Sequence, residues 1–324
     1  MSEFHVEVVR IGAIENHPNA DLLEITRVHG GYPCIVKKGT FKQGDLGIYI
    51  PIDTVLPDVP AFEFLGKDRK RLKAKRLRGV FSMGLIIPAE EGMVEGQDVT
   101  EHLGVTRWEE PEPATMKGEN EKAPIGWYFT HYTDIEGLRR YQDVLIPGEE
   151  VVLGEKLHGS NFRAIHDGER LWVGSRTCIK ARDENNLWWK VALAIDLETR
   201  LASIPFHIFF GEVYGQVQDL KYGHTGKNTA SLRVFDVFDV KEGKYLDHDV
   251  AVEMANSIGL DWVPILYRGP WSKELFSMAE GSSVLADHVR EGFVVKPIEE
   301  RYAHRVGRVI LKLHGEGYLT RKDK

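Results

Sequence analysis

Cysteine is scarce in this 324-residue chain, which contains only Cys34 and Cys178. Two cysteines are too few for a disulfide framework and are not spaced to bind a metal, so we expect an intracellular, cytoplasmic protein. Long apolar runs are also missing, since no segment approaches the roughly 20 apolar residues of a membrane-spanning helix. The first residues also lack the basic start and apolar core of a signal peptide. These absences argue against secreted disulfide-rich proteins and membrane proteins.

An overall excess of basic residues is missing too, because the formal net charge is −7. The exception is the short segment from Lys67 to Arg78, in which eight basic residues stand against one acidic residue, Asp68. Solvated protein surfaces usually mix charges of both signs, whereas phosphates are held by clustered Lys and Arg. We therefore predict that this basic run contacts a polyanion through Lys67, Arg69, Lys70, Arg71, Lys73, Lys75, Arg76 and Arg78.

The chain divides near Trp108. Before it, short β-like runs alternate with glycine-rich turns, which indicates a small β-barrel; the runs are residues 4–14, 24–28, 34–36, 46–51 and 80–88. Residues 109–122 are rich in Glu, Pro and Lys and show no hydrophobic periodicity, as a linker does. We predict an amino-terminal domain over 1–107, a linker over 108–124 and a second domain over 125–324.

The second domain mixes strand-like and helix-like patterns. Two stretches have helical periodicity, residues 186–202 and 247–258. The strand-like runs around them are rich in β-branched and aromatic residues and lie at 149–153, 162–166, 170–173, 207–213, 232–240, 292–296 and 308–313. This pattern predicts an α+β domain of antiparallel sheets flanked by helices.

Three short boxes in this domain carry chemistry. Lys156 opens the sequence KLHGSN, Glu291 opens EGFVVK, and Lys312 lies in LKLH. A single lysine would most often be a surface charge, but three such boxes in order on strand-like runs suit a covalent nucleotidyltransferase. That chemistry needs an amine to attack an α-phosphate, a carboxylate to hold a metal, and further lysines to neutralise phosphates. A lysine with the ordinary pKa of about 10.4 must be discharged by a cation or by burial before it attacks.

The boxes resemble those of ATP-dependent DNA ligases, RNA ligases and mRNA capping enzymes. DNA ligases usually have Asp where His158 stands, and the Lys-x-His-Gly-x-Asn pattern looks like RNA ligase. With the wider context GEEVVLGEKLHGSNFRA and the amino-terminal HPNADLLE region, the chain resembles the RNA ligases typified by the Deinococcus radiodurans enzyme. The resemblance implies an OB-like barrel joined to a nucleotidyltransferase domain of the ATP-grasp-like ligase type.

The resemblance also implies a role for individual residues. Lys156 becomes linked to AMP, Glu155 faces the adenine edge, and His158 and Asn161 serve the steps at the RNA ends. Arg176 holds a strand or nucleotide, Glu212 meets the ribose and assists the metal, and Phe235 stacks on adenine. Glu291 holds the metal, directly or through water, and Lys296 and Lys312 surround the α-phosphate. Some relatives have a second lysine two residues after Lys312, whereas this chain has His314.

The implied function is an ATP-dependent RNA ligase that uses Mg²⁺ or Mn²⁺ and joins RNA 3′-hydroxyl and 5′-phosphate ends through lysyl-AMP, as in nick repair. Two alternatives stay open at this point. One is a DNA ligase or a GTP-using capping enzyme, which shares the chemistry. The other is a non-catalytic RNA-binding protein built on the barrel.

Overall fold

The structure is a computed structural model that describes residues 4–109, 119–122, 131–223 and 229–321, apart from the side chains of 67–69. The chain forms two compact units. The first contains Met1–Pro111, Glu136–Gln142 and Leu319–Lys322, and the second contains Glu112–Ile135, Asp143–Tyr318 and Asp323–Lys324. The predicted boundaries at 107 and 124 stay a prediction, since each unit also takes short segments from elsewhere in the chain.

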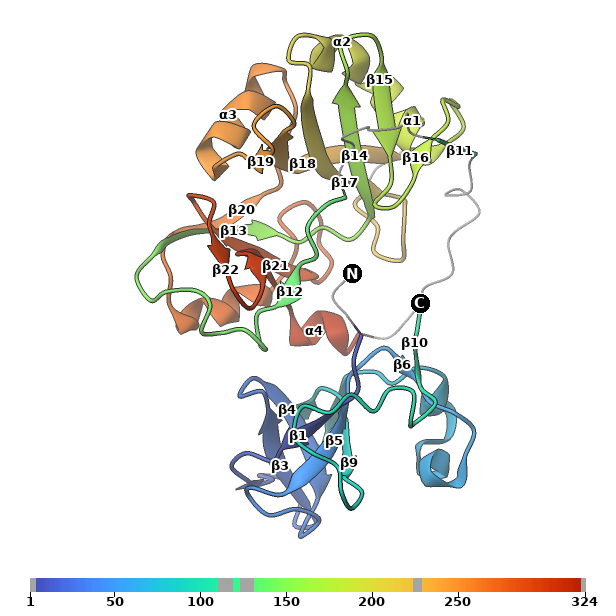
Figure 1. The fold of residues 1–324 in the computed structure, drawn as a ribbon, viewed down its shortest axis with the longest axis vertical. Coiled ribbons are helices and arrows are strands. Elements are labelled where there is room, and N and C mark those ends of the chain that lie inside the picture. The colour runs from blue at the N-terminus through green and yellow to red at the C-terminus, as the bar shows by residue number, and fades with distance from the viewer. Residues whose placement is uncertain (1–3, 110–118, 123–130, 224–228, 322–324) are drawn as a thin grey trace. The chain divides into compact units, whose positions relative to one another are not determined.

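The first unit is built from short strands, as the alternating runs predict (Figure 1). Its sheets have the strand orders β1-β5-β9, β2-β3-β4, β7-β8 and β10-β6. The predicted run at 80–88 is two strands rather than one, because Gly84 turns the chain with a φ of 105°. The elements are β1 (Glu7–Arg10), β2 (Glu15–Asn16), β3 (Leu23–Val28), β4 (Tyr32–Lys37), β5 (Leu46–Ile50), β6 (Thr54–Val55), the 3₁₀ segment η1 (Pro60–Lys70), β7 (Lys75–Leu77), β8 (Val80–Ser82), β9 (Leu85–Pro88), β10 (Thr106–Arg107) and β12 (Glu136–Gly137).

The second unit contains a large antiparallel sheet with the strand order β11-β16-β15-β14-β17-β18-β19. A smaller antiparallel sheet runs β24-β21-β13-β20. The strands are β11 (Asn120–Glu121), β13 (Glu150–Glu155), β14 (Ser160–His166), β15 (Leu171–Gly174), β16 (Ile179–Lys180), β17 (His207–Gly215), β18 (Ala230–Asp239), β19 (Lys244–Tyr245), β20 (Ile265–Pro270), β21 (Gly292–Pro297), β22 (Tyr302–Ala303), β23 (Gly307–Arg308) and β24 (Leu311–His314).

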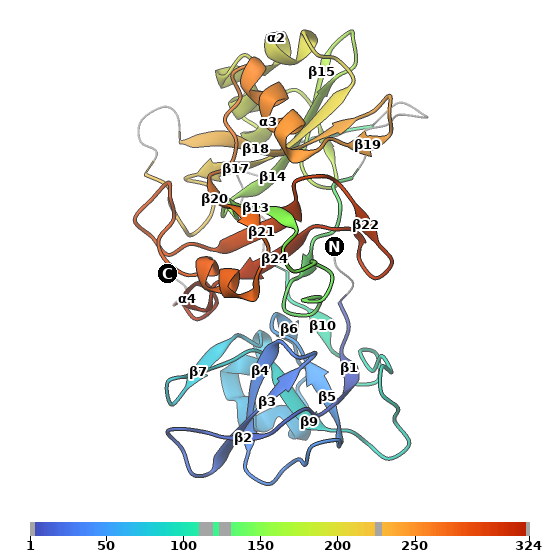
Figure 2. The same ribbon diagram turned by 90° about the vertical axis from the view of Figure 1, so that its left-hand side faces the viewer.

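Helices α1, α2 and α3 of this unit lie beside β14, β15 and β18 (Figures 1 and 2). The predicted helix at 186–202 is two helices, because Asp196 adopts a left-handed φ of 50° between them. Asn186 caps the first of the two by accepting hydrogen bonds from two backbone amides. The helical elements are α1 (Leu187–Ala194), α2 (Leu197–Ala202), α3 (His248–Ser257), the 3₁₀ segment η3 (Lys273–Ala279) and α4 (Glu316–Leu319).

The large sheet is buried on both faces. Phe162 and Phe209 belong to an apolar cluster that includes α1 and α2, whereas Ile165 and Phe210 belong to a second cluster that includes Ile310. Successive residues of one strand, such as Phe209 and Phe210, thus enter different clusters, as the period of two requires. The α+β class with antiparallel sheets is confirmed.

Candidate functional site

Lys156 lies directly after β13, at the point where the smaller sheet approaches β14. Its backbone amide donates a hydrogen bond to the carbonyl of Gly292 at 3.0 Å, because β13 pairs with β21. This pairing places Gly292 opposite the lysine and so brings Glu291, the residue before β21, next to it. The Lys156 Nζ atom lies 2.7 Å from Glu291 Oε1. Two residues 135 positions apart in the sequence thus form one ion pair.

Gly159 brings a second carboxylate to the lysine. A Cβ atom on Gly159 would lie 2.1 Å from the carbonyl oxygen of Val213, so only glycine permits this close approach. The following strand pairs with β17 in a register that places Asn161 opposite Glu212. Glu212 is thereby close enough to Lys156 to raise its pKa.

The charges at the lysine are strongly coupled. Burial lowers the pKa of Lys156, but Glu291 and Glu212 together outweigh it, so this pKa lies above the ordinary value. Burial raises the pKa of Glu291, but Lys156, His158 and His314 overcome it and hold this pKa well below its usual range. For Glu212, burial prevails over the attraction of Lys156 and raises the pKa to about 7. Glu291 and Glu212 therefore favour the protonated, positively charged form of Lys156.

His158 lies next to Glu291 and makes several other polar contacts. Its Nε2 atom lies 2.5 Å from Asp219 Oδ1, and its Nδ1 atom lies 3.2 Å from the Tyr318 hydroxyl and 3.4 Å from Glu291 Oε2. The backbone amide of His158 donates to the Tyr222 hydroxyl at 2.8 Å. Asp219 lies in the loop after β17 and Tyr318 lies in α4. Because both are far from Lys156 in the sequence, no sequence motif revealed them as part of the site.

Three buried oxygen atoms of the site have no hydrogen-bond partner among the described residues. They are Oε1 of Glu155, Oδ1 of Asn161 and Oε2 of Glu291. The other carboxylate oxygen of Glu155 accepts a hydrogen bond from the backbone amide of Val284 at 2.8 Å. A buried polar atom left unpaired is costly, so such atoms commonly await a ligand or water.

Arg176 and Lys312 also lie near the lysine. Arg176 forms an ion pair with Asp134, and its positive charge acts to lower the pKa of Lys156, against the two carboxylates. Lys312 pairs across the sheet with Val294, and its charge reaches both Asp134 and His314. His314, which replaces a possible second lysine, has its Nε2 atom 3.4 Å from Glu291 Oε1.

Phe235 occupies a β-bulge. The register between β17 and β18 shifts so that Phe210 pairs with Asp236 and Gly211 with Val234, which leaves Phe235 as the extra residue. Bulges redirect a side chain out of the regular alternation and are common next to active sites. The ring of Phe235 is partly buried and lies edge-on to the ring of Tyr132, with centroids 5.1 Å apart.

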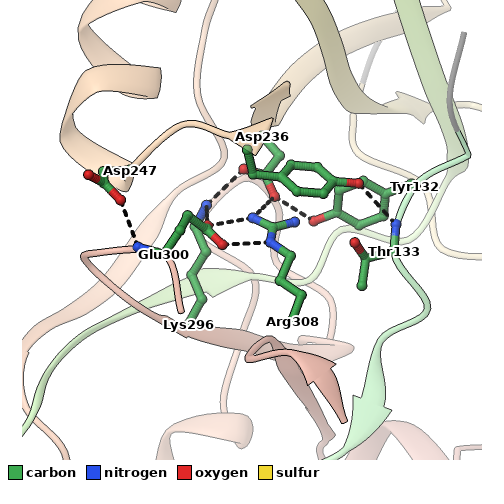
Figure 3. A network of polar contacts seen from close by, with 8 residues as sticks. Tyr132, Thr133, Asp236, Asp247, Lys296, Glu300 and Arg308 are labelled. Atoms are coloured by element: carbon green, nitrogen blue, oxygen red, sulfur yellow. Dashed lines mark hydrogen bonds and ion pairs between the residues drawn. The ribbon is translucent and has the colours of Figure 1, made fainter. Parts of the chain in front are cut away.

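Lys296 is placed differently from the other predicted phosphate ligands. Its side chain is 6% exposed, and its Nζ atom lies 2.8 Å from Asp236 Oδ1 and 3.3 Å from Glu300 Oε1 (Figure 3). It thus belongs to a buried ion cluster beside Phe235. The predicted contact of Lys296 with the α-phosphate stays a prediction, and these contacts give it a structural role as well.

The basic run of the first unit follows the end of η1, β7 and the turn into β8. Arg71 pairs with Asp53 at 2.8 Å, and its guanidinium lies 3.5 Å from the centre of the Trp108 ring. Lys70, Arg76 and Arg78 are exposed, while Lys73 and Lys75 are partly exposed. The side chains of Lys67 and Arg69 lie outside the described residues.

The two carboxylates beside Lys156 suit a divalent cation that also binds a nucleotide. Among the residues the structure describes, no group of three or more His, Cys, Asp and Glu side chains is arranged to hold a metal. Mg²⁺ and its substitutes in nucleotide sites commonly take one or two carboxylates, with water and phosphate oxygens supplying the rest. Glu291 and the partly buried Glu212 fit that donor set.

Comparison with known proteins decides the family. A family model described as RNA ligase matches residues 149–314, a range that contains all three boxes. The chain belongs to the RNA ligase family. A second model, described as an OB-fold domain, matches residues 5–89 and agrees with the predicted OB-like barrel.

Solved structures of one RNA ligase, from Naegleria gruberi, resemble nearly the whole chain. A lysine-to-alanine variant with ATP and Mn is 26% identical, with 98% of each chain covered and a TM-score of 0.83. A glutamate-to-alanine variant with AMP and Mn is also 26% identical, with 97% of each chain covered and a TM-score of 0.82. The enzyme with PPi is 25% identical, with 97% of each chain covered and a TM-score of 0.81.

One further protein matches a shorter stretch of this chain. The phenylalanine–tRNA ligase beta subunit of Anaeromyxobacter dehalogenans is 38% identical over 88 residues. The match covers 26% of this chain and about a tenth, 10%, of that subunit. Within the described ranges, none of the helices has the length and apolar character needed to cross a membrane.

Proposed function

We propose that this protein is an ATP-dependent RNA ligase that joins a 3′-hydroxyl to a 5′-phosphate through a lysyl-AMP intermediate, as in the repair of nicked RNA. The observation that carries the proposal is the position of Lys156, 2.7 Å from Glu291 and close to the partly buried Glu212. Membership of the RNA ligase family supports it. The ATP, AMP, PPi and Mn bound in the Naegleria gruberi structures support the choice of nucleotide and metal.

The first step makes the lysyl-AMP bond. The Nζ atom of Lys156 gives up its proton and attacks the α-phosphorus of ATP. The bond from that phosphorus to the β-phosphate oxygen breaks, and pyrophosphate leaves. A divalent cation, Mg²⁺ or Mn²⁺, held by Glu291 and Glu212 would offset their negative charge and so favour the neutral amine. The chain itself aligns the amine through the pairing of β13 with β21.

The nucleotide is held by residues around this lysine. We assign the unpaired Oε1 atom of Glu155 to a donor on the adenine edge and the ring of Phe235 to stacking on the base. Arg176 and Lys312 supply positive charge to the phosphates. The predicted contact of Lys296 with the α-phosphate would require its side chain to leave Asp236 and Glu300.

The later steps move AMP to the RNA. A 5′-phosphate oxygen attacks the phosphorus of lysyl-AMP and displaces Lys156. AMP is thereby joined to the 5′-phosphate, which is now activated. A 3′-hydroxyl then attacks the 5′-phosphate and expels AMP, leaving a 3′-5′ phosphodiester. We assign His158 and Asn161 to these steps, and the basic run of the first unit to the RNA backbone.

A sealing assay tests the substrate class. Nicked duplexes would be prepared with RNA or DNA on each side of the break, and incubated with ATP or GTP and with Mg²⁺ or Mn²⁺. We expect sealing with ATP that requires RNA at the 3′-hydroxyl side. Equal sealing of an all-DNA nick would indicate a DNA ligase, and use of GTP a capping-type enzyme. Binding of RNA without sealing would indicate a non-catalytic protein.

A further inference from the structure

A buried ion network lies next to Phe235. Its members are Asp236, Lys296, Glu300, Arg308 and Tyr132, which we call the Asp236 network (Figure 3). Asp236 is fully buried. It lies 2.8 Å from Lys296 Nζ and 2.6 Å from Arg308 Nη2, and it accepts a hydrogen bond from the Tyr132 hydroxyl at 2.8 Å.

The network connects two sheets. Asp236 belongs to β18 of the large sheet, Lys296 to β21 of the smaller one, and Arg308 to the hairpin strand β23. Arg308 also forms two hydrogen bonds with Glu300, at 2.7 and 2.5 Å. Two acids and two bases thus balance their charges away from water, and each has at least two partners. Nη1 of Arg308 is a buried atom of this network without a hydrogen-bond partner among the described residues. The paired charges still fix the geometry, since any displacement leaves a charge unpaired.

Tyr132 links this network to the ring at the bulge. Its hydroxyl donates to Asp236 while its ring lies edge-on to Phe235, with centroids 5.1 Å apart and planes at 64°. Tyr132 is itself held by Phe210 and Tyr245, with ring centroids 4.8 and 5.9 Å away. Phe235 is therefore constrained twice, through the backbone of the neighbouring Asp236 and through contact with an immobilised ring.

We propose that Tyr132 is a positioning residue for the nucleotide, which orients Phe235 for stacking on the base and is itself anchored by the Asp236 network. This inference rests on the proposed function of Phe235 as the stacking ring. A ring held in its bound orientation loses little freedom when the nucleotide arrives, and this favours binding. Tyr132 does not touch the reacting atoms, so its effect falls on nucleotide affinity and not on the chemical step.

The test measures lysyl-AMP formation at a series of ATP concentrations. Tyr132→Phe keeps the ring but removes the hydrogen bond to Asp236. We expect the half-saturating ATP concentration to rise about tenfold, the equivalent of one hydrogen bond, with an unchanged maximal rate constant. Tyr267→Phe is the matched control, because its hydroxyl donates to the Pro270 carbonyl at 3.0 Å in the same unit. It should leave both values unchanged.

A double variant separates positioning from a general loss of structure. If Tyr132 acts through Phe235, then adding Tyr132→Phe to Phe235→Leu should raise the half-saturating ATP concentration no further. Arg308→Lys keeps the buried positive charge but removes the paired hydrogen bonds of the guanidinium group, and so disturbs the Asp236 network without changing Tyr132. It should also raise the half-saturating ATP concentration. Independent multiplicative effects of the two substitutions, or an unchanged half-saturating concentration in both Tyr132→Phe and Arg308→Lys, would overturn the inference. A wild-type protein that forms no adduct would instead overturn the proposed function, and this inference with it.

Discussion

Arg308 and Arg268 form the same kind of ion pair with a carboxylate, one in the protein interior and the other on the surface. Each arginine forms two hydrogen bonds with one carboxylate, Arg308 with Glu300 at 2.7 and 2.5 Å and Arg268 with Asp249 at 2.7 and 2.8 Å. Their surroundings differ. The side chain of Arg308 is 2% exposed, whereas that of Arg268 is 53% exposed.

We predict that Arg308→Met destabilises the second unit far more than Arg268→Met. Removing Arg308 leaves the buried Asp236 and Glu300 with Lys296 as their remaining cation in the network. Loss of one partner from a buried ion pair costs about 3–5 kcal/mol. For a domain of this size that corresponds to a fall of roughly 6–20 °C in melting temperature. Arg268→Met should change stability little, because water and salt screen the exposed pair.

Thermal and urea unfolding of the two variants, each beside wild type, measures this difference. Adding Asp236→Asn to Arg308→Met should recover part of the loss, since it removes the uncompensated carboxylate. Equal destabilisation by Arg308→Met and Arg268→Met would refute the reasoning. It would mean that the network contributes no more than an exposed ion pair.

Three further predictions concern other parts of the molecule. Gly159→Ala should lower the rate of lysyl-AMP formation at least about tenfold, since its Cβ would meet the Val213 carbonyl at 2.1 Å. An unchanged rate would show that β17 can shift to make room for the Cβ without disturbing the site. Burial raises the pKa of Asp236, but Arg308 and Lys296 hold it below the ordinary value, so this carboxylate stabilises the fold above pH ~4 and loses that effect as pH falls through its folded pKa. The stability difference between wild type and Asp236→Asn, followed by urea unfolding, should therefore shrink on acidification, and a constant difference would contradict it. Replacing Lys75, Arg76 and Arg78 by Gln should weaken RNA binding and its salt dependence but leave lysyl-AMP formation unchanged, and a loss of adduct in this variant would assign the run a different role.

The structure brings together several residues that the sequence singled out, while their roles stay predictions. The boxes at Lys156 and Glu291 place both residues at strand ends, and antiparallel pairing of β13 with β21 brings them together. Lys156 and Glu291 could be chosen because their residue types and neighbouring glycines suit the chemistry, and Glu212 because of the resemblance to RNA ligases. The α+β class followed from patterns of period two and 3.6.

Other features depend on tertiary packing that no local pattern reveals. The bulge at Phe235 breaks strand alternation, so the sequence could not show how that ring is oriented. Lys296 resembles a phosphate ligand in its box, yet the buried Asp236 is 2.8 Å from it. Asp219 and Tyr318 contact His158 from distant segments. The break between α1 and α2 has Asp196 in the left-handed conformation, where glycine is the more common residue. The sequence therefore gave no sign of this break.

The central claim is that Lys156 is the amine that carries AMP. Incubation with α-labelled ATP and Mg²⁺ or Mn²⁺, followed by acid precipitation and peptide mapping, tests it most directly. We predict one labelled peptide containing Lys156, no labelling in Lys156→Ala, and loss of labelling when the metal is chelated. Label on another residue, or an equally labelled Lys156→Ala protein, would contradict it.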